Sequence, residues 1–174
     1  MKIFRNILAV TLFFCLGGGA YAQQGGYNAG LEGWAGYSTK GVLPFWLRSN
    51  RFGSVPLDGA SMSLIGFAGK DFDSANGRLF DWGGALEGRG NLGHDSEFKL
   101  IEAYGKIRLG IFEVKGGRSR KITGLCDSTL SSGSWSVSGN NLGIPEIDVS
   151  IPDFYALPWF GELFAFKGNF SHGW

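Results

Sequence analysis

Apolar and polar side chains alternate along much of this chain, and that alternation limits what it can fold into. From Phe80 to Leu86 the even positions are apolar or small, whereas Asp81 and Glu87 occupy odd positions. From Ile101 to Leu109 the odd positions are apolar or small and the even positions are polar. A period of two residues is that of a β-strand, and no window shows a sustained helical period. The sequence therefore predicts an all-β protein without a helix.

The same alternation recurs elsewhere, and turn residues separate the runs. It is visible over residues 112–115, 134–138 and 164–174, while Ala60–Phe72 is apolar on both faces. Turns are predicted at Asn76-Gly77, at Gly93-His94-Asp95, near Gly110 and at Asn140-Asn141. These runs predict seven or eight antiparallel strands.

The first 22 residues have the pattern of a secretory signal peptide. Lys2 and Arg5 precede an apolar run, Ile7–Leu16, which is followed by Ala20-Tyr21-Ala22. Ten apolar residues form a helix of about 15 Å, half of a bilayer core, which argues against a membrane anchor. We expect cleavage after Ala22 and export. Cys126 is then the one cysteine left, so no internal disulfide is expected.

An alternating strand can bury its apolar face or present it to lipid. A secreted sandwich does the first and a transmembrane barrel the second. Three features favour the barrel: the signal peptide, glycine on the strands (30 of 174 residues are glycine), and aromatic residues near strand ends, namely Phe80, Trp82, Trp159, Phe160 and Trp174. The sequence thus predicts an antiparallel transmembrane β-barrel in the cell outer membrane, with the sandwich as the alternative.

Composition and motifs exclude several function classes. The formal net charge is +1, so no basic excess points to nucleic acid. Gly88–Gly93 matches a dinucleotide-binding fingerprint, but it lies in a strand pattern and no helix follows it. His94, His172 and Cys126 are too few ligands for a closed zinc site, and no nucleophile elbow is present. We expect no cofactor, no metal and no catalytic site.

Two irregular segments are rich in residues that loops seldom carry. Leu43–Gly53 combines three aromatic residues and two arginines around a proline. The second segment is Ser138–Pro145, followed by Glu146–Pro152. The first is interpreted either as a segment packed into the mouth of the barrel or as a ligand platform.

Four stretches together carry a family resemblance. They are PFWLRSNRFG (residues 44–53), GGRSRKITGL (116–125), SGNNLGIPEIDVSIPDF (138–154) and FAFKGNFSHGW (164–174). Their order resembles the capsule assembly Wzi family of Bacteroidetes-type bacteria. The resemblance implies an outer-membrane barrel of about eighteen strands. It also implies a lectin-like, non-catalytic role in holding or organising capsular polysaccharide, with outer-membrane lipid and other capsule export components as further partners.

Sugar polymers are held by aromatic faces and by hydrogen bonds, weakly at each site and at many sites. The candidate ligand residues are Arg89, Tyr104, Lys106 and Arg108 in the lumen, and Trp46, Arg48, Asn50 and Arg51 in the irregular segment. The alternative for each is a structural ion pair or a contact of the packed segment. A porin-like diffusion channel, which the same lumen charges would serve, is the alternative function.

The predicted organisation has three parts. Residues 1–22 form the signal peptide, residues 23–58 an N-terminal strand and the irregular aromatic segment, and residues 59–174 barrel strands. Residues 23–174 supply roughly eight spanning strands at about 10 residues each. We therefore expect the N-terminal part of a larger barrel; the alternative is a small, self-contained barrel.

Overall fold

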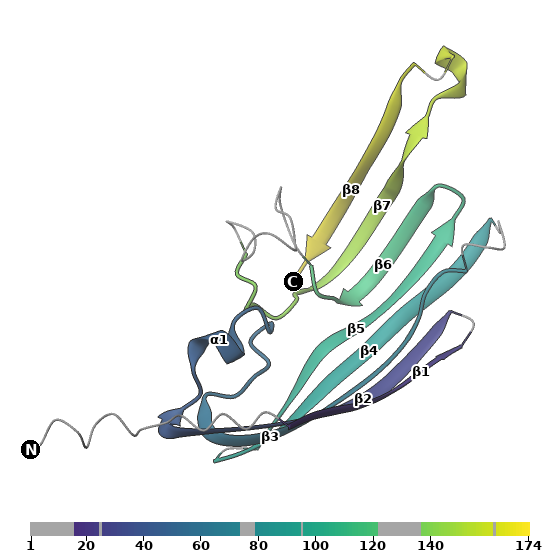
Figure 1. Ribbon diagram of the computed structural model, residues 1–174. Coiled ribbons are helices and arrows are strands. Elements are labelled where there is room, and N and C mark those ends of the chain that lie inside the picture. The colour runs from purple at the N-terminus through teal and green to yellow at the C-terminus, as the bar shows by residue number, and fades with distance from the viewer. Residues whose placement is uncertain (1–15, 25, 74–78, 95, 122–136, 162) are drawn as a thin grey trace, which may run out of the picture.

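The computed structural model describes residues 16–24, 26–73, 79–94, 96–121, 137–161 and 163–174. They form one eight-stranded antiparallel sheet in which each strand pairs with its neighbour in the sequence (Figure 1). The strands are β1 (Leu16–Gln24), β2 (Tyr27–Val42), β3 (Asp58–Lys70), β4 (Phe80–Leu92), β5 (Glu97–Leu109), β6 (Phe112–Arg118), β7 (Pro145–Ala156) and β8 (Ala165–Gly173). The all-β antiparallel prediction is confirmed.

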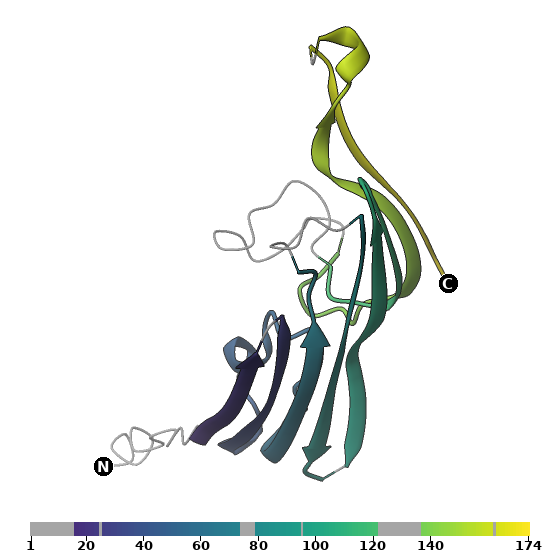
Figure 2. The same cartoon turned by 90° about the vertical axis from the view of Figure 1, so that its right-hand side faces the viewer.

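The sheet is curved and open. Its two edges are β1 and β8, which do not pair with each other (Figure 2). The prediction that the chain contains no helix is wrong at two short places: α1 (Phe45–Arg48) lies in the first irregular segment, and a 3-10 turn, η2 (Pro158–Phe160), joins β7 to β8. In the described part of the chain, no helix is long and apolar enough to cross a membrane.

The two faces of the sheet differ in the manner the alternation indicated. One face, here called the outer face, exposes large apolar side chains such as Leu64, Leu86 and Val149. The other, the inner face, carries Ser63, Arg89 and Asp148, all of them buried. Leu86 is 57% exposed, whereas Arg89 is 4% exposed. In most water-soluble proteins large apolar residues are buried and arginine is exposed, so this arrangement is inverted.

One residue departs from the predicted face. The sequence places Ile101 with Ile107 and Leu109 on the apolar face, but Ile101 is 4% exposed and lies on the inner side. The reason is a register shift: Glu87 pairs with Glu102, whereas Gly88 pairs with Leu100. The extra residue reverses the alternation, as a β-bulge does.

The second irregular segment is less irregular than the sequence indicated. Strand β7, Pro145–Ala156, includes all of Glu146–Pro152. It pairs with both β6 and β8. Its prolines sit at the first residue of β7 and at a register shift between Ile151 and Tyr155, where strands tolerate proline. The hairpin expected at Asn76-Gly77, and Trp135 of the strand expected at 134–138, lie outside the described residues.

Strand β1 overlaps the predicted signal peptide. It pairs with β2 from Leu16↔Ala35 to Gln24↔Tyr27. Cleavage after Ala22 would remove most of β1 and leave β2 as the edge. We predict that the mature protein, purified from membranes and sequenced from its N-terminus, begins at Gln23. A mature chain that begins at Met1 and retains β1 would contradict the signal peptide.

Candidate functional site

The segment between β2 and β3, residues 43–57, packs against the inner face of the sheet. Leu43 and Val55 are buried at its two ends, and the Leu43 N–H donates a hydrogen bond to the Leu57 carbonyl at 3.0 Å. α1 begins directly after Pro44, and the proline φ of −57° suits a helix start. We call residues 43–57 the inner segment. It is the aromatic, arginine-containing stretch that the sequence singled out.

Four buried polar side chains hold the inner segment to the sheet. Asn91 on β4 accepts hydrogen bonds at its Oδ1 from Ser63 Oγ (2.7 Å) and Arg89 Nε (3.0 Å). Its Nδ2 donates to the Ser54 carbonyl at 2.9 Å. Arg89 also donates to Ser63 Oγ at 3.0 Å and to Ser54 Oγ at 3.4 Å. Buried polar groups of this kind are stable only when they are hydrogen-bonded, so the network fixes the position of Ser54.

The two irregular segments contact each other. The Phe52 N–H donates to the Gly139 carbonyl at 3.0 Å, and the Arg51 N–H donates to Asn140 Oδ1 at 3.3 Å. Phe52 has a φ of +52°, and a Cβ on Gly53 would lie 2.7 Å from the Asn140 carbonyl oxygen. A positive φ at a phenylalanine is uncommon and persists only when its surroundings impose it. Docking on residues 139–140 is that constraint.

A hollow of about 490 Å³ lies between the inner segment and the inner face. Asn50, Arg51 and Phe52 line it from the segment. From the sheet and the end of β6, its lining includes Glu32, Glu87, Arg89, Glu102, Tyr104 and Arg120. The hollow thus combines aromatic rings, guanidinium groups, carboxylates and an amide, which is the mixture that binds a hydroxyl-rich ligand.

An ion-pair cluster forms one wall of the hollow. Arg120, which follows β6, contacts Glu87 on β4 and also Glu102 on β5 at 3.2 Å. Its guanidinium carbon lies 5.5 Å from the centre of the Phe52 ring. Burial lowers the pKa of Arg120, but its hydrogen bond to Glu102 and the charges of both carboxylates outweigh that effect and raise the pKa above its ordinary value. Arg120 is therefore a permanent cation that holds two acidic groups side by side.

The structure brings together four of the eight ligand residues predicted from the sequence. Asn50, Arg51, Arg89 and Tyr104 line the hollow. Trp46 does not: it is 71% exposed on α1. Arg48 also lies outside the lining of the hollow, and its Nε donates to the Leu43 carbonyl at 3.2 Å.

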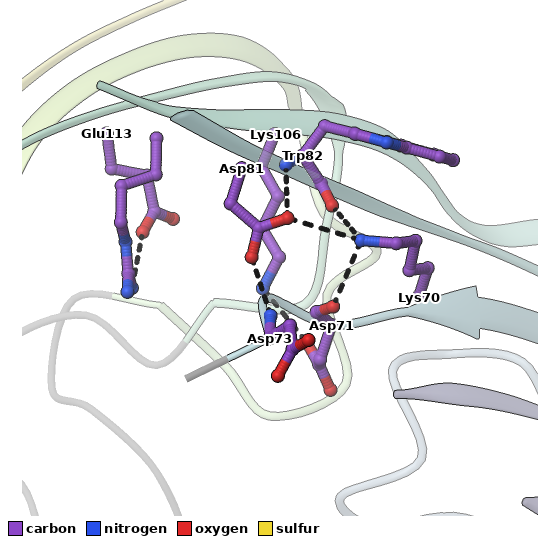
Figure 3. A network of polar contacts seen from close by, with 8 residues as sticks. Lys70, Asp71, Asp73, Asp81, Trp82, Lys106 and Glu113 are labelled. Atoms are coloured by element: carbon purple, nitrogen blue, oxygen red, sulfur yellow. Dashed lines mark hydrogen bonds and ion pairs between the residues drawn. The ribbon is translucent and has the colours of Figure 1, made fainter. Parts of the chain in front are cut away.

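Lys106 belongs to a separate polar cluster near the β3–β4 connection (Figure 3), and Arg108 contacts the same Phe72 ring as Lys106. Lys106 forms an ion pair with Asp71 at 2.9 Å, and Arg108 forms one with Glu113 at 3.7 Å. Both cations lie 4.3 Å from the centre of the Phe72 ring. Lys70 in the same cluster contacts Asp81 and the ring of Trp82. Because their charges are already paired, this cluster has the character of a structural contact.

Sequence reasoning missed the acidic half of the hollow. Glu87 and Glu102 were placed on the polar face by the alternation, yet neither was named as a candidate, and Arg120 lies beyond the strand pattern. Cross-strand pairing of Glu87 with Glu102 puts two like charges opposite each other. Such a pair is destabilising on its own and therefore calls for a nearby cation, but the pairing depends on the register between β4 and β5, which the sequence pattern does not give.

Among the described residues, no group of three His, Cys, Asp or Glu side chains is arranged to hold a metal ion. Comparison of the chain with protein-family models, with curated proteins and with solved structures gave no match.

Proposed function

We propose that this chain is part of an outer-membrane β-barrel protein of capsule assembly that binds or organises capsular polysaccharide at the cell surface without chemical turnover. The observation that carries the proposal is the inverted sheet. Large apolar residues cover its outer face, and a hollow lined by aromatic, guanidinium, carboxylate and amide side chains lies on its inner face. The resemblance to the Wzi family supports the assignment to capsule assembly.

The outer face has the properties required of a surface in contact with lipid. Its exposed side chains on adjacent strands include Leu64, Leu86, Ile107, Val114 and Val149. Tyr27 and Trp82 lie near the end of the sheet that carries the Gly110-Ile111 turn, and both rings face Lys70. Aromatic and cationic residues at one level are typical of the boundary between hydrocarbon and water.

The lengths of the connections support an orientation. The two longest connections, residues 43–57 and 119–144, lie at one end of the sheet together with the short connection 93–96. The other end carries residues 25–26, 71–79, 110–111 and 157–164. In outer-membrane barrels the longer connections face the outside of the cell. This orientation places the inner segment towards the cell surface, where capsular polysaccharide lies.

The inner segment favours a binding protein over an open channel. It lies against the inner face and is held there by hydrogen bonds between Ser54 and the side chains of Arg89 and Asn91. The segment therefore occupies space that an open channel would leave to water. A porin-like channel remains a measurable outcome, because it predicts steady ion conductance in planar bilayers that long polysaccharide does not block. Binding predicts instead that polysaccharide is retained by the protein.

Tyr104 offers a direct test of the hollow. We expect Tyr104→Ala to weaken the binding of purified capsular polysaccharide about tenfold, equivalent to about 1.4 kcal/mol, because an aromatic wall of the hollow is lost. Tyr37, on the outer face and 54% exposed, is the matched control, and Tyr37→Ala should bind as the unchanged protein does. Binding can be measured by surface plasmon resonance with the protein in detergent. Equal binding by both variants would contradict the proposed location of the site.

A further inference from the structure

Arg89 is a buried cation that no carboxylate neutralises at close range. It is 4% exposed, yet among the described residues no carboxylate oxygen lies within 4.0 Å of its guanidinium. Glu87 and Glu32 act on it only from a longer distance, and Glu87 is in contact with Arg120. A buried charge is strongly unfavourable unless it is paired.

The hydrogen bonds of Arg89 leave part of its guanidinium unused. Its partners, Asn91, Ser63 and Ser54, are all uncharged. Within the described residues, these contacts use three of its five N–H donors and leave two without a partner. The ring of Trp34, 5.4 Å from the guanidinium carbon, contacts the cation but cannot neutralise it. The site therefore has spare donors as well as a cation without a carboxylate in direct contact among the described residues.

Arg51 adds a second cation to the same part of the hollow. It is exposed, lines the hollow together with Arg89, and is near enough to repel the charge of Arg89. Like Arg89, it forms no salt bridge within the described residues. Two arginines that line one hollow, neither with a carboxylate oxygen within 4.0 Å among the described residues, favour an anion from outside the protein. Guanidinium groups match the geometry of carboxylate and phosphate groups.

We propose that Arg51 and Arg89 form a subsite for the oxyanion group of an acidic sugar unit, a carboxylate or a phosphate, within the polysaccharide bound in the hollow. This inference rests on the proposed function and makes it more specific. Arg89 supplies a buried, pre-positioned cation at the back of the subsite. Arg51, at the exposed side, supplies the second cation.

Calorimetric titration of the full chain in detergent micelles tests the subsite with three polymers of similar length. They are an alginate oligomer, which carries carboxylates, a polyglycerol phosphate, which carries phosphodiesters, and dextran, which is neutral. We expect at least one of the acidic polymers to bind about tenfold more tightly than dextran. The tighter of the two identifies the anion, and added NaCl should weaken its binding.

Substitution of Arg51 separates the subsite from general charge effects. Arg51→Gln should weaken binding of the acidic polymer about tenfold and weaken dextran binding much less, while Arg51→Lys should restore part of the loss for the acidic polymer. Lys40→Gln is the control, because it removes one positive charge from an exposed position outside the lining of the hollow. Circular dichroism checks that each variant keeps its strand content.

The outcomes separate the two proposals. Equal binding of dextran and the acidic polymers, or unchanged binding by Arg51→Gln, would overturn the anion subsite while leaving polysaccharide binding in place. Failure of the unchanged protein to bind any of the three polymers or the purified capsular polysaccharide would overturn the proposed function and the subsite with it.

Discussion

The substitution Leu86→Arg should prevent stable insertion of the protein into the outer membrane. Leu86 lies midway along β4 on the outer face, where it is 57% exposed and pairs with Ala68 and Ala103 on the neighbouring strands. Arginine on the lipid-facing side of a barrel costs about 2 to 4 kcal/mol at the middle of the bilayer. The measurement is the amount of protein that stays in outer-membrane fractions after a urea wash.

The control for this prediction is the same substitution at the end of the strand. Leu79, immediately before β4, is 81% exposed. Near the membrane boundary an arginine costs only about 0 to 1 kcal/mol. Leu79→Arg should therefore insert nearly as well as the unchanged protein. Normal insertion of Leu86→Arg would show that the outer face does not contact lipid.

Asn91→Ala should give the largest loss of stability among substitutions on the inner face. The change leaves Ser63 Oγ, Arg89 Nε and the Ser54 carbonyl without their shared partner in a buried region. Each buried group left without a hydrogen bond costs about 1 to 3 kcal/mol, so we expect a loss of about 3 kcal/mol or more. Urea unfolding in detergent, followed by circular dichroism, measures it.

Ser61 provides the matched control on the neighbouring strand. Its hydroxyl is buried on the same face and has no hydrogen-bond partner among the described residues. Ser61→Ala removes a buried hydroxyl without breaking a bond, so stability should change by less than about 0.5 kcal/mol or increase. A loss for Ser61→Ala as large as that for Asn91→Ala would show that packing, and not the hydrogen-bond network, determines the stability of this face.

Most strands could be predicted because the alternation of apolar and polar residues and the turn residues both agree with the observed fold. Alternation around Phe80 and Ile107 gives both the strand and the face, and Gly110, with a φ of +58°, gives the turn between β5 and β6. Ile101 was placed on the wrong face because a bulge depends on pairing between two strands, which no single segment contains. The strand β7 was missed in part because its prolines hide the alternation.

Only half of the candidate site could be predicted, because the sequence pattern shows the side of the sheet for strand residues but not the contacts between distant segments. Residues on a strand inherit their side of the sheet from the alternation, which placed Arg89 and Tyr104 correctly on the inner face. Arg120 lies after the end of β6, so no periodic pattern indicates where its side chain reaches. Its contacts with Glu87 and Glu102 depend on the order in which β4, β5 and β6 pair.

The contact between the inner segment and residues 139–140 has a consequence for the order of folding. Arg51 and Asn140 are 89 residues apart in the sequence, whereas Arg89 and Ser54 are 35 apart. Contacts between distant residues form later, because a longer stretch of chain must be ordered before they can be made. The inner segment can thus dock on β4 while the later strands are still assembling, but Phe52 reaches its final conformation only after the chain has passed β6.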